Sequence, residues 1–193
     1  MSGMRSVVFM MSVSLDGFME GPDRSIEWQL VDAEVHAHLN EWLAAAGAFL
    51  DGRVTWELMA GFWPLADRDP AAGPTMVEFA RIWREMPKIV YSRTLSPEAL
   101  GWNTTLARSV EVDDIERLKA SPGGDLVVGG AELAAEFMRH DLIDEYRVYV
   151  HPVLIGRGKR MFLDPSVKAS LTLAEGRVFG NGVVLLRYRR LGR

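Results

Sequence analysis

The stretch Ala48-Phe49-Leu50-Asp51-Gly52-Arg53-Val54-Thr55 joins a short apolar run to a glycine turn and the beginning of a helix. Its three apolar residues predict a buried strand, because short apolar runs bounded by turn residues are typical of central strands. The residues from Val54 to Ala60 have the composition of a helix. Strand, turn and helix units of this kind are the building blocks of α/β folds.

The same alternation of strands and helices continues outward from this unit in both directions. Apolar runs predict strands at residues 5–14, 48–50, 88–91 and 125–128, with a weaker candidate at 102–108. Helices are predicted at residues 32–46, 54–60, 75–85, 113–120 and 131–139, and in the first and last of these the apolar residues are spaced three and four apart. Thr75 is expected to cap the third of these helices.

The last third of the chain has a different pattern, in which strands follow one another without helices. Segments 145–155, 171–179 and 183–188 are rich in β-branched and aromatic residues. The turn Gly180-Asn181-Gly182 predicts a hairpin, because Gly and Asn tolerate the positive φ of tight turns. We therefore predict a single α/β domain over residues 1–193, with a central mixed β-sheet flanked by helices and antiparallel C-terminal strands.

Composition excludes several kinds of protein. The 193 residues include no cysteine, which rules out disulfide scaffolds, Cys-ligated zinc, iron–sulfur clusters and thiolate nucleophiles, and favours a cytoplasmic location. A net charge of −4 argues against nucleic-acid binding, and no apolar run reaches the roughly 18 residues of a membrane helix. No metal site is expected, since His36 and His38 are two residues apart on a helix and point in different directions.

Two strand-to-helix turns contain the candidate phosphate-binding groups, Asp51-Gly52-Arg53-Val54-Thr55 and Val128-Gly129-Gly130-Ala131-Glu132. A helix N-terminus offers unpaired amides and a partial positive charge, and glycine lets the backbone approach an anion closely. Either turn alone could be only a tight connection, and neither matches the dinucleotide motif G-x-G-x-x-G or a P-loop. Ser92 and Arg93 follow another predicted strand, and could hold a 2′-phosphate or belong to a solvated loop.

Five short motifs occur in a fixed order along the chain: Ser14-Leu15-Asp16-Gly17, Gly52-Arg53-Val54-Thr55-Trp56-Glu57, Ser92-Arg93, Val127-Val128-Gly129-Gly130, and Pro152-Val153-Leu154-Ile155-Gly156 before Gly158 and Phe162. Their order and spacing resemble the dihydrofolate-reductase superfamily, and within it the reductase domain of bacterial riboflavin biosynthesis (RibD C-terminal type). The resemblance covers nearly the whole chain. It implies a dihydrofolate-reductase-like fold of three layers.

The resemblance also implies NADPH as the cofactor. In relatives, the counterparts of Gly52 to Thr55 hold the dinucleotide phosphates, those of Ser92 and Arg93 the adenosine phosphate, and those of Gly129 to Leu133 the pyrophosphate and the nicotinamide side. Relatives often have a cis peptide between the two glycines. The cofactor-binding residues expected on this basis are Ser14, Gly17, Gly52, Arg53, Val54, Thr55, Ser92, Arg93, Gly129, Gly130, Ala131, Glu132 and Leu133.

The positions expected around the substrate depart from the family pattern. Riboflavin reductases typically have a lysine and a glutamate where this chain has Met10 and Val128. The acidic residue with which dihydrofolate reductases bind the pterin has no unambiguous equivalent on the first helix. The substrate is therefore not identified, and the candidate pocket residues are Asp16, Trp28, Asp32 and His36. His36 could protonate a substrate near neutral pH, or it could be an ordinary surface histidine.

These observations predict an NADPH-dependent reductase that transfers a hydride to a C=N or C=O bond of a small heterocyclic or sugar-derived substrate, with no catalytic residue assigned. Two alternatives stay open: a noncatalytic module that binds NADPH or a small ligand on the same fold, and a dihydrofolate reductase. A homodimer is expected from the strand-rich C-terminal third, because association can cover a strand edge or an apolar face, and from the resemblance to dimeric riboflavin reductases.

Overall fold

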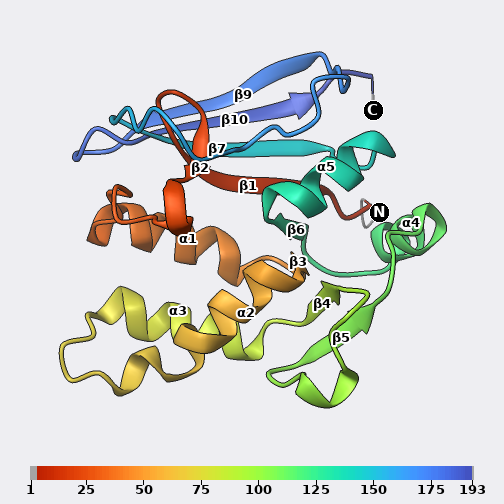
Figure 1. Ribbon diagram of the computed structural model, residues 1–193, viewed down its shortest axis with the longest axis horizontal. Helices are drawn as coiled ribbons and strands as arrows, with labels where there is room; N and C mark the ends of the chain where they lie inside the picture. Colours follow the sequence, from red (N-terminus) through yellow and green to blue (C-terminus); the bar gives the residue numbers. More distant parts are fainter. Residues whose placement is uncertain (1–3, 193) are drawn as a thin grey trace.

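The computed structural model describes residues 4–192, and an eight-stranded sheet forms the centre of this region (Figure 1). In spatial order its strands are β5 (Thr104–Ala107), β4 (Lys88–Tyr91), β3 (Ala48–Gly52), β6 (Leu126–Gly129), β1 (Val7–Ser14), β7 (Glu145–His151), β10 (Val184–Arg190) and β9 (Leu171–Val178). Neighbouring strands from β5 to β7 are parallel, whereas β10 is antiparallel to both β7 and β9. The predicted mixed sheet with antiparallel C-terminal strands is confirmed.

Helices cover both faces of the parallel part of this sheet (Figure 1). They are α1 (Ala33–Ala44), α2 (Arg53–Phe62), α3 (Pro74–Glu85), α4 (Val112–Ala120) and α5 (Ala131–Arg139), with single turns of 3-10 helix at η1 (Pro22–Arg24) and η3 (Pro97–Ala99) and a longer one at η2 (Trp63–Arg68). Phe49 and Val127 pack against α1 and α3, whereas Leu50 and Val128 pack against α4 and α5. Within residues 4–192, no helix combines the length and the apolar character that crossing a bilayer requires.

The parallel strands end at one edge of the sheet, which we call the carboxyl edge. Gly52 pairs with Tyr91, and Asp51 pairs with Gly129. Farther along the sheet, the last residue of β1 pairs with the last residue of β7. The turns that follow these strands therefore gather at the carboxyl edge, where ligands of open α/β sheets bind.

A second, two-stranded sheet was not predicted from the sequence. Strand β2 (Phe18–Glu20) pairs antiparallel with β8 (Lys159–Arg160). The loop that enters β8 approaches β2 so closely that a Cβ atom on Gly158 would lie 2.0 Å from the carbonyl oxygen of Glu20. Strands of two and three residues are too short to show an alternating pattern, and this explains the missed prediction.

Several predicted element boundaries differ from the structure by one or a few residues, and two of these differences have a clear physical reason. Helix α3 begins at Pro74 with Gly73 as its N-cap, so Thr75 lies inside the first turn and does not cap the helix. Proline suits the first helical position because its missing amide would have no partner there. Strand β7 ends at His151, four residues earlier than predicted, since Pro152 has no amide hydrogen to continue the ladder.

The predicted hairpin between β9 and β10 is present. Gly182 has a φ of +88°, the left-handed conformation that favours glycine. Its amide donates to the carbonyl of Phe179 at 3.0 Å, and Asn181 Oδ1 accepts from the amide of Val183 at 3.1 Å. The predicted hairpin is therefore confirmed, although only Gly182 of the three turn residues has a positive φ.

Candidate functional site

The N-termini of α2 and α5 lie next to each other at the carboxyl edge. Each helix follows its strand almost directly, with Gly52 as the N-cap of α2 and Gly130 as the N-cap of α5. Strands β3 and β6 are neighbours in which Asp51 pairs with Gly129, so the two helix starts are neighbours as well. Neither N-cap supplies a side-chain hydrogen bond, which leaves the first-turn amides and their partial positive charge available to an anion.

A side chain on either glycine of the turn Gly129-Gly130 would meet a neighbouring side chain. Gly130 has a φ of +88°, and a Cβ atom on it would lie 2.6 Å from Thr55 Oγ1. A Cβ atom on Gly129 would lie 2.3 Å from Asp51 Oδ1. Residues 4–192 contain no cis peptide bond, so the cis bond that the resemblance implied between the two glycines is not present. The chain changes direction here through the positive φ of Gly130.

Gly52 is a glycine for a different reason, because no crowding requires it. Its φ is −70°, and the nearest described atom to a Cβ at this position would be Leu133 Cβ at 3.9 Å. Local packing would therefore accept a larger residue. A phosphate group on the amides of α2, however, needs open space in front of the first turn. The glycines of both turns thus fit a cradle for dinucleotide phosphates.

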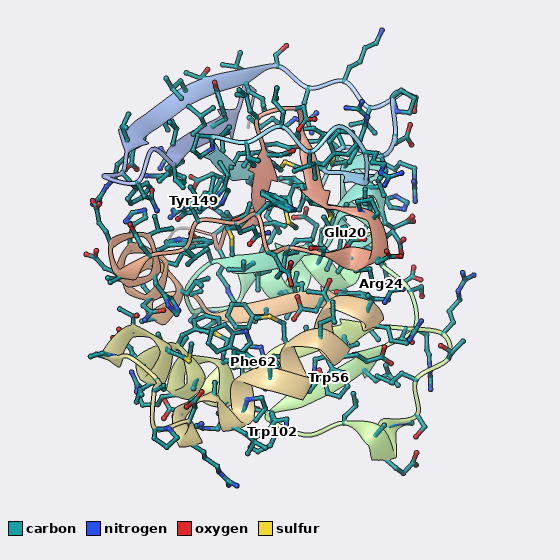
Figure 2. The ribbon with its side chains drawn as sticks, turned by 60° about the vertical axis from the view of Figure 1, so that its left-hand side comes forward. Glu20, Arg24, Trp56, Phe62, Trp102 and Tyr149 are labelled. Carbon is teal, nitrogen blue, oxygen red and sulfur yellow. The ribbon has the colours of Figure 1, made fainter. Side chains whose placement is uncertain are left out.

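Charged side chains from several segments surround the start of α5. Lys159 Nζ donates to Glu132 Oε1 at 2.7 Å, and this hydrogen bond is the main reason why the pKa of Glu132 is lowered. The positive charges of Arg24 and Arg53 contribute to the same shift. Arg53 also pairs with Glu57 at 2.7 Å on the exposed side of α2. Figure 2 shows Arg24 on the segment after β2, near Glu20. Sequence reasoning missed Arg24 and Lys159, because the pairing of β2 with β8 brings them here.

Ser92 and Arg93, expected to hold a 2′-phosphate, lie in a well-braced turn after β4. Ser92 is buried, and its Oγ accepts hydrogen bonds from the amides of Thr94 at 3.2 Å and Leu95 at 3.0 Å. Arg108 Nη1 donates to the carbonyls of Ser92 and Leu95 at 3.0 and 2.8 Å. Arg93 is exposed in the middle of this turn. Ser92 therefore shapes the turn, and Arg93 is the more accessible group for a ligand.

Asp16 connects the end of β1 to a loop far along the chain. Its Oδ2 accepts a hydrogen bond from the amide of Gly156 at 2.8 Å. Ser14 Oγ donates to Asp16 Oδ1 at 2.6 Å, and this hydrogen bond is the largest of the causes that lower the pKa of Asp16. The carbonyl of Gly17 accepts from the amide of Met161 at 3.1 Å. Ser14, Asp16 and Gly17 thus anchor the loop that carries β8 beside the start of α5.

Trp28 lies against His151 at the end of β7. The two rings meet edge to face, with their centroids 5.6 Å apart. His151 is fully buried, and its Nδ1 accepts a hydrogen bond from the amide of Leu30 at 2.9 Å, which assigns the ring proton to Nε2. Burial lowers the pKa of His151. The neutral ring therefore holds the segment that leads into α1.

Asp32 and His36, the other candidate pocket residues, both have structural partners. Asp32 caps α1, because its Oδ1 accepts from the amide of the third helical residue at 3.0 Å. His36 packs against Trp63 and Phe79, with 5.9 Å between its ring centroid and each of theirs. Burial lowers the pKa of His36, and the charge of a nearby glutamate only partly opposes this. Trp28 contacts β7 whereas His36 contacts η2 and α3, so these candidates lie against different parts of the fold.

Apolar core residues stand where riboflavin reductases typically have a lysine and a glutamate. Val128 is fully buried in the core cluster on the α4 and α5 side of the sheet. Met10 is partly buried and packs on the opposite side, between the clusters formed around α1 and α3 and around Tyr149. Neither position offers a charged group to a substrate.

Two hollows on the surface lie away from the carboxyl edge. One of about 510 Å³ lies at the amino ends of β1 and β7, and one of about 700 Å³ lies along α3. Salt-bridged side chains line both, such as Lys119 with Asp144 in the first and Arg84 with Asp67 in the second. We locate the candidate site at the carboxyl edge because the unpaired helix amides point there. Within residues 4–192, no three His, Asp or Glu side chains are arranged to hold a metal ion.

Comparison with known proteins gives a consistent family assignment. The model of the family described as RibD C-terminal domain matches residues 5–185. Two proteins of Bacillus subtilis (strain 168), both named as uncharacterized, are similar over nearly their whole length. YyaP is 30% identical over 188 residues, which cover 95% of this chain and 94% of YyaP. YwjB is 27% identical over 184 residues, which cover 94% of this chain and 96% of YwjB.

Solved structures share the fold at low sequence identity. A Shewanella sp. PV-4 protein named for riboflavin biosynthesis has a TM-score of 0.72 and 21% identity, and the match covers 96% of this chain and 98% of that one. A pyrimidine reductase-like protein from Corynebacterium diphtheriae has a TM-score of 0.65 and 14% identity, with 98% and 93% covered. A deaminase/reductase from Thermotoga maritima has a TM-score of 0.66 and 16% identity, with 97% of this chain and 57% of that longer chain covered. These neighbours confirm the dihydrofolate-reductase-like fold.

Proposed function

The chain belongs to the RibD C-terminal domain family, and from this premise we propose that it is an NADPH-dependent reductase. The proposed reaction transfers a hydride to a C=N or C=O bond of a small heterocyclic or sugar-derived substrate. The observation that carries the proposal is the pair of adjacent helix N-termini after Gly52 and Gly130, with no side-chain cap on either and with open space at Gly52.

The residues at the carboxyl edge fit the cofactor by their chemistry. Amides at residues 53–55 and 131–133 would bind the phosphates, because helix N-termini favour anions. The guanidinium of Arg53 and the exposed guanidinium of Arg93 would add charge-assisted hydrogen bonds, Arg93 to the 2′-phosphate. When bound, NADPH supplies the hydride. The protein then has to orient the substrate against the cofactor and provide a path for a proton.

The side chains near the substrate suggest that this proton comes through water. The carboxylates of Asp16 and Asp32 accept hydrogen bonds from backbone amides, which occupies them structurally. Burial lowers the pKa of both His36 and His151, so neither ring is protonated readily at neutral pH. We propose that the substrate differs from that of riboflavin reductases, because the chain has no charged group at their lysine and glutamate positions.

The same departures favour a second candidate function, a noncatalytic module that binds NADPH or a small ligand. Met10 and Val128 remove two polar groups that riboflavin reductases typically have, while the phosphate cradle stays complete. Fold alone does not decide between a reductase and a binding module. Dihydrofolate reduction stays as a third candidate, to be tested with dihydrofolate and methotrexate.

The decisive experiment separates cofactor binding from catalysis. Fluorescence titration is expected to show tighter binding of NADPH than of NADH, and Arg93→Ala should lose on the order of 1.5–3 kcal/mol of NADPH affinity, about one charge-assisted hydrogen bond. Gly52→Val should weaken binding without strain in the unliganded protein, because nothing crowds that position. Equal affinity for the two cofactors would contradict the role of Arg93. NADPH consumption with a panel of carbonyl and imine compounds then distinguishes a reductase from a binding module.

A further inference from the structure

Asp51, at the end of β3, is a buried carboxyl group that the proposed function does not use. The residue is 6% exposed. Among residues 4–192 its carboxyl oxygens make no hydrogen bond or ion pair, although buried carboxylates are normally paired, and they are not among the fully buried polar atoms that lack a hydrogen-bond partner. Its Oδ1 lies directly against the backbone of Gly129, where a Cβ atom would be 2.3 Å away. The carboxyl group therefore adjoins the turn that begins α5.

The elements packed against β3 bring little compensating charge to Asp51. Strand β6 has no titratable side chain. On β4, α2 and α5 the titratable side chains are Lys88, Tyr91, Arg53, Glu57, Glu132, Glu136 and Arg139. Helices α1, α3 and α4, which pack on Phe49 and Leu50 of the same strand, add Glu34, His36, His38, Glu41, Glu78, Arg81, Arg84, Glu85, Asp113, Asp114, Glu116, Arg117 and Lys119. Of these groups, Lys88 is the one whose charge shifts the pKa of Asp51. These charged groups on α2 and α5 already have partners. Arg53 pairs with Glu57 within α2, Glu136 pairs with Arg139 within α5, and Glu132 pairs with Lys159. Lys88 is the nearest compensating charge, but its Nζ donates to the carbonyls of Met86 and Trp102, each at 2.7 Å.

An unpaired carboxyl group in this setting favours its neutral form. Burial raises the pKa of Asp51 to about 7, and the charge of Lys88 only partly opposes this. Near neutral pH, the unliganded protein therefore contains both the ionised and the neutral form. Phosphate groups on the amides of the Gly129-Gly130 turn would add negative charge beside the carboxylate. Their repulsion would favour the neutral form further.

We infer that the dinucleotide binds with uptake of a proton by the Asp51 carboxylate, so that Asp51 makes cofactor affinity fall as the pH rises. The proton comes from solvent and forms the O–H bond of the neutral carboxyl group, and no other bond changes. The inference rests on the proposed function, because it requires phosphates at this turn. The effect assigned to Asp51 is that of its charge alone.

The test is the pH dependence of NADPH binding, measured by isothermal titration calorimetry. The unmodified protein is expected to lose NADPH affinity about tenfold between about pH 6 and about pH 8.5. This loss corresponds to a rise of about one unit in the pKa of Asp51 on binding, because each such unit changes the affinity tenfold. Asp51→Asn preserves the shape of the side chain but cannot ionise, so its affinity should change much less. Glu85→Gln removes an exposed carboxylate from α3, and this matched control should retain the full pH dependence.

A second measurement keeps the test valid even where Asp51→Asn does not fold. Titrations of the unmodified protein in buffers with different heats of ionisation report proton exchange, and net uptake is expected near pH 7.5. Pairing of the 2′-phosphate with arginine would release protons, which is the opposite sign. Equal pH dependence in Asp51→Asn and the unmodified protein, or no proton uptake, overturns the inference and leaves the proposed function intact. Failure to bind NADPH at any pH overturns the proposed function itself.

Discussion

Asp51, on the parallel strand β3, is buried and makes no hydrogen bond or ion pair among residues 4–192, whereas Glu145, on β7 where the sheet changes from parallel to antiparallel pairing, is buried among arginines. Glu145 accepts hydrogen bonds from Arg147, Arg187 and Arg189 at 2.7, 2.8 and 3.2 Å. Burial raises the pKa of Glu145, but the hydrogen bonds from Arg187 and Arg147 outweigh this and hold it below its usual value. The Glu145 carboxylate joins β7 to β10, whereas the Asp51 carboxyl group lies at the carboxyl edge, where we place the ligand.

The parallel and antiparallel halves of the sheet also differ in what covers them. Strands β1, β3 and β6 are buried on both faces, as parallel strands between helices must be. Strand β9 is exposed along most of its length, with Leu173 and Val178 54% and 73% exposed. Their register partners on β10, Tyr188 and Val184, continue the same face and are half-buried. We propose that this apolar face pairs with a second copy of the chain, so that the parallel half binds the ligand and the antiparallel half associates.

The largest expected effect is on the contact that attaches the β8 loop to β2. Gly158→Ala would put a Cβ 2.0 Å from the Glu20 carbonyl at a φ of +142°, and should lower the free energy of unfolding by about 3 kcal/mol or more. Gly156→Ala is the matched control, because it has a φ of +73° with no atom within 4 Å, and should cost about 1 kcal/mol. Urea unfolding measures both. Equal losses of stability in the two variants would show that the close approach of Gly158 to the Glu20 carbonyl does not matter for stability.

Glu145→Gln should have the next largest effect. It is expected to lower stability by about 2 kcal/mol near pH 7, because it leaves guanidinium groups without their charged partner. The pKa of Glu145 is lowered, so its stabilising effect is present above the unfolded pKa and is lost as the pH falls through the folded value. The difference between the two proteins should therefore shrink in acid. Glu175→Gln, which removes the half-exposed carboxylate 3.3 Å from Arg187, should cost about 0.5 kcal/mol or less.

Asp51→Asn should show the opposite pH dependence in the unliganded protein. The pKa of Asp51 is raised, so the neutral carboxyl group stabilises the folded state fully below the unfolded pKa, and this is lost as the pH rises through about 7. Relative to the unmodified protein, Asp51→Asn should gain about 1.4 kcal/mol for each pH unit between the unfolded pKa and about 7. Thermal melts across this range measure it. If the difference in stability between the two proteins stayed constant across this pH range, Asp51 would be ionised in the folded protein throughout.

The smallest expected change in subunit stability comes from the exposed face of β9. Val178→Glu combined with Leu173→Glu should convert a dimer to a monomer while changing the stability of each subunit by about 0.5 kcal/mol or less, because both side chains are exposed in the single chain. Light scattering at micromolar concentration measures the mass. Leu65→Glu, at an exposed leucine in η2, is the control and should leave the mass unchanged. One subunit mass for the unmodified protein would contradict the proposed association.

Much of the site could be predicted because its backbone is built locally. Gly52 and Gly130 each stand between a strand and a helix that are contiguous in sequence, so pattern alone located both helix N-termini. The sequence did not show, however, why each of these two positions holds a glycine. The positive φ of Gly130 and the closeness of the Thr55 side chain favour glycine there, whereas Gly52 has open space around it. That distinction depends on how β3 and β6 lie beside each other.

The sequence by itself determined the order of strands and helices, the switch from parallel to antiparallel strands, and the absence of cysteine chemistry. Those features depend on short segments, whose apolar spacing and turn residues act over a few positions. Only the tertiary structure decided that Asp16 binds the amide of Gly156, that Lys159 reaches Glu132, and that Asp51 is left unpaired beside Gly129 while Glu145 is not. Such contacts join residues far apart in the chain, and they depend on strand register and on the approach of loops, which no local pattern encodes.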